Sequence, residues 1–223
     1  MDFALALRIA ASLVAAYLLG AIPWALIIGK SVYKIDVRTA GSGNLGATNV
    51  MRVLGWKAAL ATLLLDIGKG AVAVLLAGAI VPAAVYGPAA HEWTMLGATL
   101  VAIGGHSFSP YIGFKGGKGV ATGAGTLLVL LWGTPSWLIM LLTFAIVIAA
   151  TRMVSLGSVL VAIEFPLLML RFYPGDWPLF ILAVVAAGLV LFRHSANIRR
   201  IFKGQEPKVS FKQEPPQPAK DGS

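Results

Sequence analysis

The sequence predicts an all-α, polytopic membrane protein with seven transmembrane helices. Three observations indicate this fold class: 58% of the 223 residues are hydrophobic, only 12% are charged, and the apolar residues gather in long runs. A soluble domain has on average about 45–50% apolar and about 25% charged residues. Helices are expected because lipid cannot satisfy the hydrogen bonds of an exposed backbone, and the sequence lacks the alternating polarity of membrane-barrel strands.

The predicted spans follow one another along the chain, since about 20 apolar helical residues cross a hydrocarbon core about 30 Å thick. The first is Phe3–Gly29, near one end of which Arg8 can reach the membrane surface, and the second is Ala58–Val81. The others are Trp93–Ile112, the two halves of Gly119–Ala150, Met153–Leu170 and Trp177–Phe192. Gly119–Ala150 is too long for one upright helix, and the turn-forming residues 133–136 divide it.

The distribution of basic residues predicts the orientation of these spans. An odd number of spans places the two chain ends on opposite sides of the membrane, and one side receives most of the cations. They are Lys30, Lys34, Arg38, Arg52, Lys57, Lys115, Lys118, Arg152, Arg193, Arg199, Arg200 and Lys203. The other side receives little beyond Arg8 and Arg171. By the positive-inside rule, the N-terminus lies outside and the C-terminus lies in the cytoplasm.

Two regions are expected. Residues 1–203 form the seven-helix membrane domain with cytoplasmic catalytic loops, and residues 204–223 form a flexible cytoplasmic tail that is rich in charge, proline and glycine. An alternative assigns residues 1–29 to a cleaved signal peptide. It is disfavoured because the apolar run is too long and no cleavage site follows a short apolar core.

Composition also narrows the chemistry. The chain has no cysteine, which excludes disulfides, cysteine-based metal sites and cysteine nucleophiles, and its three histidines leave few metal ligands. We therefore expect no metal ion and no cofactor, and also no nucleic-acid partner.

Two glycine-rich loops lie on the predicted cytoplasmic side, GSGNLGATN at 41–49 and GFKGGKGVAT at 113–122. Glycines let backbone N–H groups converge on an anion, and a helix that begins just after them adds its positive dipole end. Lys118 in the second loop and Arg52 after the first supply positive charge for a phosphate. The loops therefore predict an anion site, although ordinary interfacial loops whose lysines only set topology remain an alternative.

Four segments carry a resemblance to a known family: GSGNLGATNVMRVLG at 41–55, GHSFSPYIGFKGGKGVAT at 105–122, VSLGS at 154–158 and RHSANIRRI at 193–201. In order and spacing they resemble the motifs of the bacterial acyl-phosphate-dependent glycerol-3-phosphate acyltransferases, the PlsY family. The resemblance implies a bacterial inner-membrane enzyme of phospholipid biosynthesis with its active site facing the cytoplasm and no metal. Such an enzyme moves a fatty acyl group from acyl phosphate to the 1-hydroxyl of sn-glycerol 3-phosphate, and releases lysophosphatidic acid and phosphate.

The resemblance also assigns the site residues. Those implied for glycerol 3-phosphate are Ser42, Arg52, Ser155, His194 and Asn197, and those implied for acyl phosphate are Gly116, Gly117, Lys118 and Gly119. The residues expected to carry catalysis are Ser42, Arg52, Lys118, His194 and Asn197. The acyl chain would lie between helices and open to lipid. The expected partners are the two substrates, the lipid bilayer and a soluble enzyme that produces acyl phosphate.

The sequence leaves open which group accepts the proton of the attacking hydroxyl. His194 is the best side-chain candidate because imidazole titrates near neutrality, but it could equally serve only to orient the substrate. In that case the phosphate of the substrate would take the proton. His106, which precedes the second loop, is expected to shape that loop.

Three ionisable residues fall inside the predicted spans, where charge is costly. Asp66 and Lys69 are three positions apart on one helix face, so we expect a structural ion pair. Glu164 either forms a hydrogen bond with a neighbouring helix while protonated or lines the floor of the site, and the sequence alone does not distinguish these two roles.

Two other function classes are weighed against acyl transfer. An anion transporter would be expected to show repeated halves, and no convincing internal repeat is present. An intramembrane serine hydrolase would pair Ser42 with His194, but this serine lies in a loop outside the spans.

Overall fold

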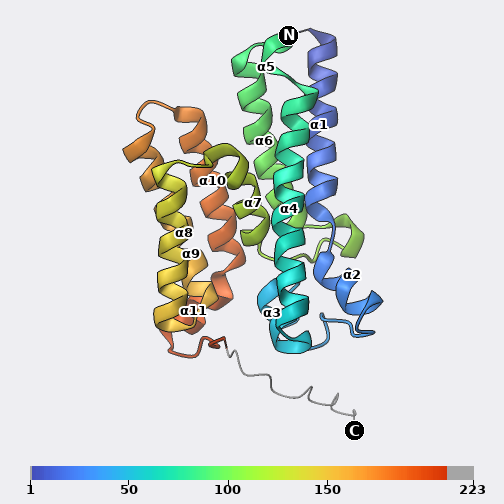
Figure 1. Ribbon diagram of the computed structural model, residues 1–223, viewed down its shortest axis with the longest axis vertical. Helices are drawn as coiled ribbons and strands as arrows, with labels where there is room; N and C mark the ends of the chain where they lie inside the picture. The colour runs from blue at the N-terminus through green and yellow to red at the C-terminus, as the bar shows by residue number, and fades with distance from the viewer. Residues whose placement is uncertain (1, 210–223) are drawn as a thin grey trace.

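The computed structural model describes residues 2–209, and these residues fold into helices without any strand (Figure 1). The helices are α1 (Phe3–Ala21), α2 (Trp24–Ser31), α3 (Ala47–Leu54), α4 (Trp56–Ile80), α5 (Ala83–Tyr86), α6 (Pro88–Ser107), the 3-10 helix η1 (Pro110–Ile112), α7 (Val120–Leu131), α8 (Pro135–Thr151), α9 (Val154–Phe172), α10 (Trp177–Arg193) and α11 (Ser195–Phe202). The predicted all-α class is therefore confirmed for this part of the chain.

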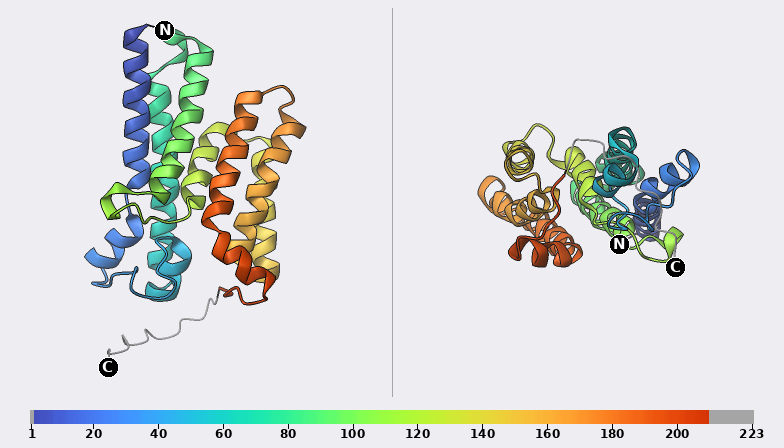
Figure 2. Two further views of the ribbon diagram at one scale, coloured as in Figure 1. Left: turned by 180° about the vertical axis from the view of Figure 1, so that it is seen from behind. Right: turned by 90° about the horizontal axis from the view of Figure 1, so that it is seen from below.

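The long helices form two groups that lie side by side. One group contains α1, α4 and α6, with α7 packed against α4, and the other contains α8, α9 and α10. The groups meet where α10 packs against α6 and α7 approaches α8 (Figures 1 and 2). The short helices α2, α3 and α11 all lie at one end of the molecule, and α5 lies at the opposite end (Figure 1).

The outer faces of these helices are apolar, as lipid contact requires. Large side chains such as Val14, Leu64 and Leu167 are about 60% exposed, at 59%, 59% and 60%. Length and composition qualify three helices as membrane-crossing: α1, α4 together with α5, and α9. A fourth is added when α10 and α11, which bend by 66° relative to each other, count as one span. The total of seven spans stays a prediction.

The prediction of a single first span, Phe3–Gly29, is wrong. The helix α1 ends at Ala21, and α2 begins only at Trp24. Pro23 is the cause, because proline has no N–H to donate and forces the preceding residue out of helical geometry. Ile22 accordingly has a φ of −57° and a ψ of 119°.

Of two other predicted helix boundaries, one is confirmed and one is displaced along the chain. The break at 133–136 is confirmed: α7 ends at Leu131, and Thr134 caps α8 by accepting the N–H of Trp137. The span predicted as Trp93–Ile112 is displaced, since α6 begins at Pro88, where a proline suits the first helical turn, and ends at Ser107.

Close helix contacts fix the position of α7, which carries the second glycine loop at its start. A Cβ at Gly70 of α4 would collide with the backbone of Thr122, and a Cβ at Gly125 of α7 would collide with the backbone of Ile67. Glycine at these positions therefore lets the two backbones touch, as small residues do in membrane helix pairs.

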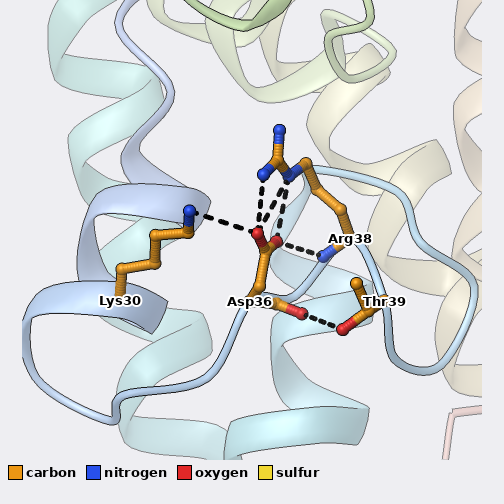
Figure 3. A network of polar contacts seen from close by, with 4 residues as sticks. All are labelled: Lys30, Asp36, Arg38 and Thr39. Atoms are coloured by element: carbon orange, nitrogen blue, oxygen red, sulfur yellow. Dashed lines mark hydrogen bonds and ion pairs between the residues drawn. The ribbon is translucent and has the colours of Figure 1, made fainter.

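An exposed ion network holds the turn between α2 and the first glycine loop. The Asp36 carboxylate accepts from Arg38 Nη2 at 2.6 Å and lies 3.3 Å from Lys30 Nζ, while its backbone carbonyl accepts the hydroxyl of Thr39 (Figure 3). The hydrogen bond from Arg38 holds the pKa of Asp36 well below its usual range. The network fixes the chain just before Gly41.

Candidate active site

One large cavity lies between the two helix groups, with a volume of about 1280 Å³. Its polar part is lined by both glycine loops and by the ends of α9, α10 and α11. Its apolar part runs between the helices and is lined by Ile103, Leu127, Trp137, Met140, Phe144 and Phe165. A single cavity therefore joins a cationic region to an apolar channel.

Eight of the nine site residues predicted from the sequence line this cavity. They are Ser42, Arg52, Gly116, Lys118, Gly119, Ser155, His194 and Asn197. The exception is Gly117, which lines a small separate cavity together with Leu45 and His106.

The first glycine loop is held by a buried amide. Asn49 is only 1% exposed, and its Nδ2 donates to the carbonyls of Val37 at 2.9 Å and Ala40 at 3.3 Å. Its Oδ1 accepts the backbone N–H of Ser42 at 2.7 Å and the Ser42 hydroxyl at 3.1 Å. Asn49 thereby shapes the loop, and Ser42 lines the cavity.

The second glycine loop is held by backbone hydrogen bonds to the end of α6. The N–H of Gly116 donates to Ser107 O at 3.1 Å, and that of Gly117 donates to His106 O at 3.0 Å. These two N–H groups are therefore engaged within the protein, and the assignment of Gly116 and Gly117 to acyl phosphate stays a prediction. A Cβ at either glycine would collide with His106, so glycine is needed here for close packing. Gly119, with a φ of 78°, opens α7 and leaves the positive end of that helix at the cavity.

Arg193 fastens this loop to α10, a contact that the sequence reasoning missed. Its Nη2 donates to the carbonyls of Gly116 at 2.7 Å and Gly117 at 2.9 Å, and its Nε donates to Gly117 O at 3.0 Å. The available signal was its place at the start of the RHSANIRRI segment, where it counts among the basic residues that predict the topology.

Lys118 begins a chain of hydrogen bonds across the polar part of the cavity. Its Nζ donates to Asn197 Oδ1 at 2.5 Å, and Asn197 Nδ2 donates to Glu206 Oε1 at 2.5 Å. The same carboxylate accepts from Ser155 Oγ at 2.7 Å and from Arg200 Nε at 2.8 Å. Glu206 lies in the predicted flexible tail, and no sequence pattern predicted it as a site residue.

Residues 204–209 therefore depart from the predicted tail. Arg52 Nη2 donates to Pro207 O at 3.4 Å, and Val209 N donates to Arg152 O at 2.8 Å. This stretch crosses the polar mouth of the cavity, whereas residues 210–223 of the predicted tail lie outside the described residues.

Burial sets the protonation of the two titratable groups that the prediction placed in the site. It lowers the pKa of Lys118 to about 8, with Glu206 opposing the shift and Arg200, Arg52 and Arg193 adding to it. Burial and the nearby Lys118 charge lower the pKa of His194 to about 4. His194 Nδ1 lies 2.8 Å from Val190 O. Because a carbonyl only accepts, Nδ1 carries the proton and Nε2 keeps its lone pair.

The predicted Asp66–Lys69 pair is present beneath the site, with Nζ and Oδ1 2.7 Å apart. Lys69 Nζ also donates to Ile22 O at 2.7 Å and lies 2.9 Å from His106 Nδ1. This cluster ties the break after α1 to the end of α6, where the His106 carbonyl accepts the N–H of Gly117. Glu164 accepts the hydroxyl of Thr143 of α8 at 3.0 Å, as the helix-bonding alternative expects.

Comparison with known proteins decides the family. The family model described as glycerol-3-phosphate acyltransferase matches residues 10–204. The chain belongs to this family. Curated glycerol-3-phosphate acyltransferases from Synechococcus sp. (strain CC9902) and Listeria monocytogenes (serotype 4b, strain F2365) are each 43% identical over 196 residues. Each alignment covers 88% of this chain, with 92% and 94% of the respective relative.

Solved structures of the family agree with the fold. The glycerol 3-phosphate form of PlsY, an integral membrane glycerol 3-phosphate acyltransferase, matches with a TM-score of 0.78 and 33% identity over 91% of this chain and 96% of that one. The lysophosphatidic acid form of PlsY matches with a TM-score of 0.76 and 32% identity. The chain is therefore an integral membrane acyltransferase of the glycerol-3-phosphate acyltransferase family.

Proposed function

We propose that this acyltransferase takes its acyl group from an acyl phosphate and transfers it to the 1-hydroxyl of sn-glycerol 3-phosphate. The observation that carries the proposal is the single cavity in which Lys118 and Arg52 lie at the end of an apolar channel. Two phosphate-bearing substrates need cations, and a fatty chain needs the channel. The related structures support the acceptor, since they are the glycerol 3-phosphate form and the lysophosphatidic acid form of PlsY.

The reaction makes modest chemical demands. The oxygen of the 1-hydroxyl attacks the acyl carbon, the bond from that carbon to the phosphate oxygen breaks, and the phosphate leaves with the bonding electrons. Because acyl phosphate is a mixed anhydride, its carbonyl is already activated. The enzyme must mainly hold two anions together and stabilise the negative charge that develops on the carbonyl oxygen.

The roles of the residues follow from this demand. Lys118 and the start of α7 at Gly119 neutralise the acyl phosphate and its developing oxyanion. Arg52 offers a planar fork for the phosphate of glycerol 3-phosphate. Ser42, Ser155, His194 and Asn197 orient the glycerol hydroxyls and phosphate through hydrogen bonds.

His194 acts here as an orienting group. With a pKa of about 4 it holds a proton poorly, but its free Nε2 accepts a hydrogen bond from the attacking hydroxyl. The proton then goes to a substrate phosphate, whose second pKa of about 6 suits that role.

We further propose the orientation and surroundings of the enzyme. Seven spans cross the bacterial inner membrane, with the N-terminus outside and the C-terminus in the cytoplasm, because α2, α3 and α11 carry many of the basic residues at one end (Figure 1). A soluble enzyme that makes acyl phosphate would deliver this donor from the cytoplasm or the membrane surface.

The serine hydrolase alternative loses support. The Ser42 hydroxyl donates to Asn49, and His194 bonds to Val190, so neither shows the serine–histidine contact that a dyad needs. The apolar channel likewise fits a bound fatty chain better than a path for a hydrated anion.

The test uses purified protein with glycerol 3-phosphate and either of two donors, acyl phosphate or an acyl thioester, beside a control without donor. The expected result is lysophosphatidic acid with equimolar phosphate from acyl phosphate alone. Product from the thioester without phosphate release would overturn the donor assignment.

A further inference from the structure

Within residues 2–209, Glu206 is the carboxylate that accepts hydrogen bonds from side chains in the polar part of the cavity. It is 9% exposed and accepts hydrogen bonds from Ser155, Asn197 and Arg200, which come from α9 and α11. Its pKa lies below the usual range: burial acts to raise it, but these hydrogen bonds and the Arg200 charge outweigh burial. An ionised carboxylate therefore faces two of the residues assigned to the substrate.

An ionised carboxylate at this place dictates the orientation of the Asn197 amide. A carboxylate only accepts, so the Asn197 NH₂ group must face it. The Asn197 carbonyl oxygen then faces Lys118 Nζ at 2.5 Å, whose ammonium only donates. Reversing the amide would oppose donor to donor and acceptor to acceptor. Glu206 therefore determines, through Asn197, where the Lys118 ammonium lies.

The backbone holds Glu206 in this place from both sides. Gln205 N donates to Arg200 O at 2.8 Å, and Val209 N donates to Arg152 O at 2.8 Å. Arg52, from the first helix group, reaches Pro207 O between these two contacts. The stretch 205–209 thus joins α3, α11 and the turn between α8 and α9 across the mouth of the cavity.

We propose that Glu206 is a positioning residue for acyl transfer, which orients Asn197 and through it holds Lys118 against the substrates. The proposal rests on the proposed function. It extends the active site past residue 204, where the match to the family model ends.

The proposal has an electrostatic consequence that a merely structural role lacks. Lys118 faces the cations Arg52, Arg193 and Arg200 and the neutral His194, while Lys115 precedes it in the loop. Glu206 offsets this repulsion. Replacing Glu206 by glutamine removes the offset, so Lys118 loses its proton at a lower pH. The alkaline limb of the activity profile then moves to lower pH.

The experiment compares the full-length wild type with Glu206→Gln, Glu206→Asp and the control Glu92→Gln, whose exposed carboxylate lies on α6 far from α11. Acyl transfer is measured against glycerol 3-phosphate concentration and pH, and monodispersity in detergent checks folding. For Glu206→Gln we expect kcat/KM to fall about tenfold and the alkaline limb to move to lower pH. For Glu206→Asp, which keeps an acceptor-only carboxylate, the limb should stay nearer the wild-type position.

The outcomes distinguish a failure of the proposed function from a failure of the positioning role of Glu206. An inactive wild type would overturn the proposed function and, with it, the positioning role that rests on it. With an active wild type, a Glu206→Gln variant that keeps wild-type kcat/KM and pH profile overturns the positioning role. An activity loss with an unmoved alkaline limb, in Gln and Asp variants alike, also overturns it, because that pattern is the one expected from general destabilisation.

Discussion

Replacing Lys118 by alanine should abolish most acyl transfer while leaving the protein folded. The ammonium belongs to the second glycine loop and lines the cavity, and burial lowers its pKa to about 8. In such a weakly screened place, losing one preorganised donor to a developing oxyanion costs about 2.7–4 kcal/mol. We therefore expect kcat to fall about 10²- to 10³-fold.

The effect on folding should be smaller. Alanine at position 118 leaves Asn197 Oδ1 without the donor it now has, at a cost of about 1–3 kcal/mol. The Gly116 and Gly117 backbone bonds that shape the loop do not involve the Lys118 side chain.

The assay is phosphate release from acyl phosphate in the presence of glycerol 3-phosphate, with the purified variant in detergent. Lys115→Ala is the matched control, since it removes the same charge from an exposed position in the same loop, and its kcat should stay within about threefold of wild type. A Lys118→Ala variant with near-normal kcat would refute the placement of Lys118 at the reacting groups.

Three further predictions concern the acceptor site, pH and topology. Arg52→Lys should raise the KM for glycerol 3-phosphate about tenfold with a smaller change in kcat, because the bidentate fork is lost; an unchanged KM would remove Arg52 from the phosphate site. Activity of the wild type should decline as pH rises through about 8, where Lys118 gives up its proton, and a profile that stays flat well above that pH would contradict this role. In this cysteine-free chain, Asn44→Cys and Lys203→Cys should react with an impermeant maleimide only in inside-out vesicles, and labelling in right-side-out vesicles would reverse the topology.

The helix boundaries show which parts of the fold the sequence reveals. Around residues 133–136, glycine, threonine and proline act locally, so the break between α7 and α8 was predictable. Pro23 acts just as locally, yet the break after α1 was missed because the apolar run continues on both sides of it. Hydropathy reports burial in lipid and does not report helix continuity.

Some features of the candidate site could likewise be predicted from the sequence, and others could not. The placement of Arg52, Lys118 and Asn197 at one cavity was predictable, because their residue types suit phosphate chemistry and lie in motifs that resemble one family. The role of Gly117 was not, since it depends on the carbonyl of His106, which packs against the loop only in three dimensions. Glu206 was missed because a polar stretch next to prolines looks like a tail until its partners on α9 and α11 are seen.

The burial of His194 illustrates the same limit. From sequence alone an imidazole near the membrane surface is a candidate base, because its ordinary pKa is near neutrality. The folded cavity removes water and adds the Lys118 charge, which lowers the pKa to about 4. Only the tertiary surroundings lower the pKa of this candidate base, and the orienting role proposed for it rests on them.

The central claim, that one cavity holds both phosphates with the fatty chain in the adjoining channel, is tested most directly by a crystal structure with both glycerol 3-phosphate and a non-hydrolysable acyl phosphate analogue bound. The account predicts Lys118 Nζ within about 3 Å of the analogue, Arg52 at the phosphate of glycerol 3-phosphate, and the chain beside Phe144 and Phe165. Phosphates bound in separate cavities, or a chain that leaves the channel empty, would contradict it.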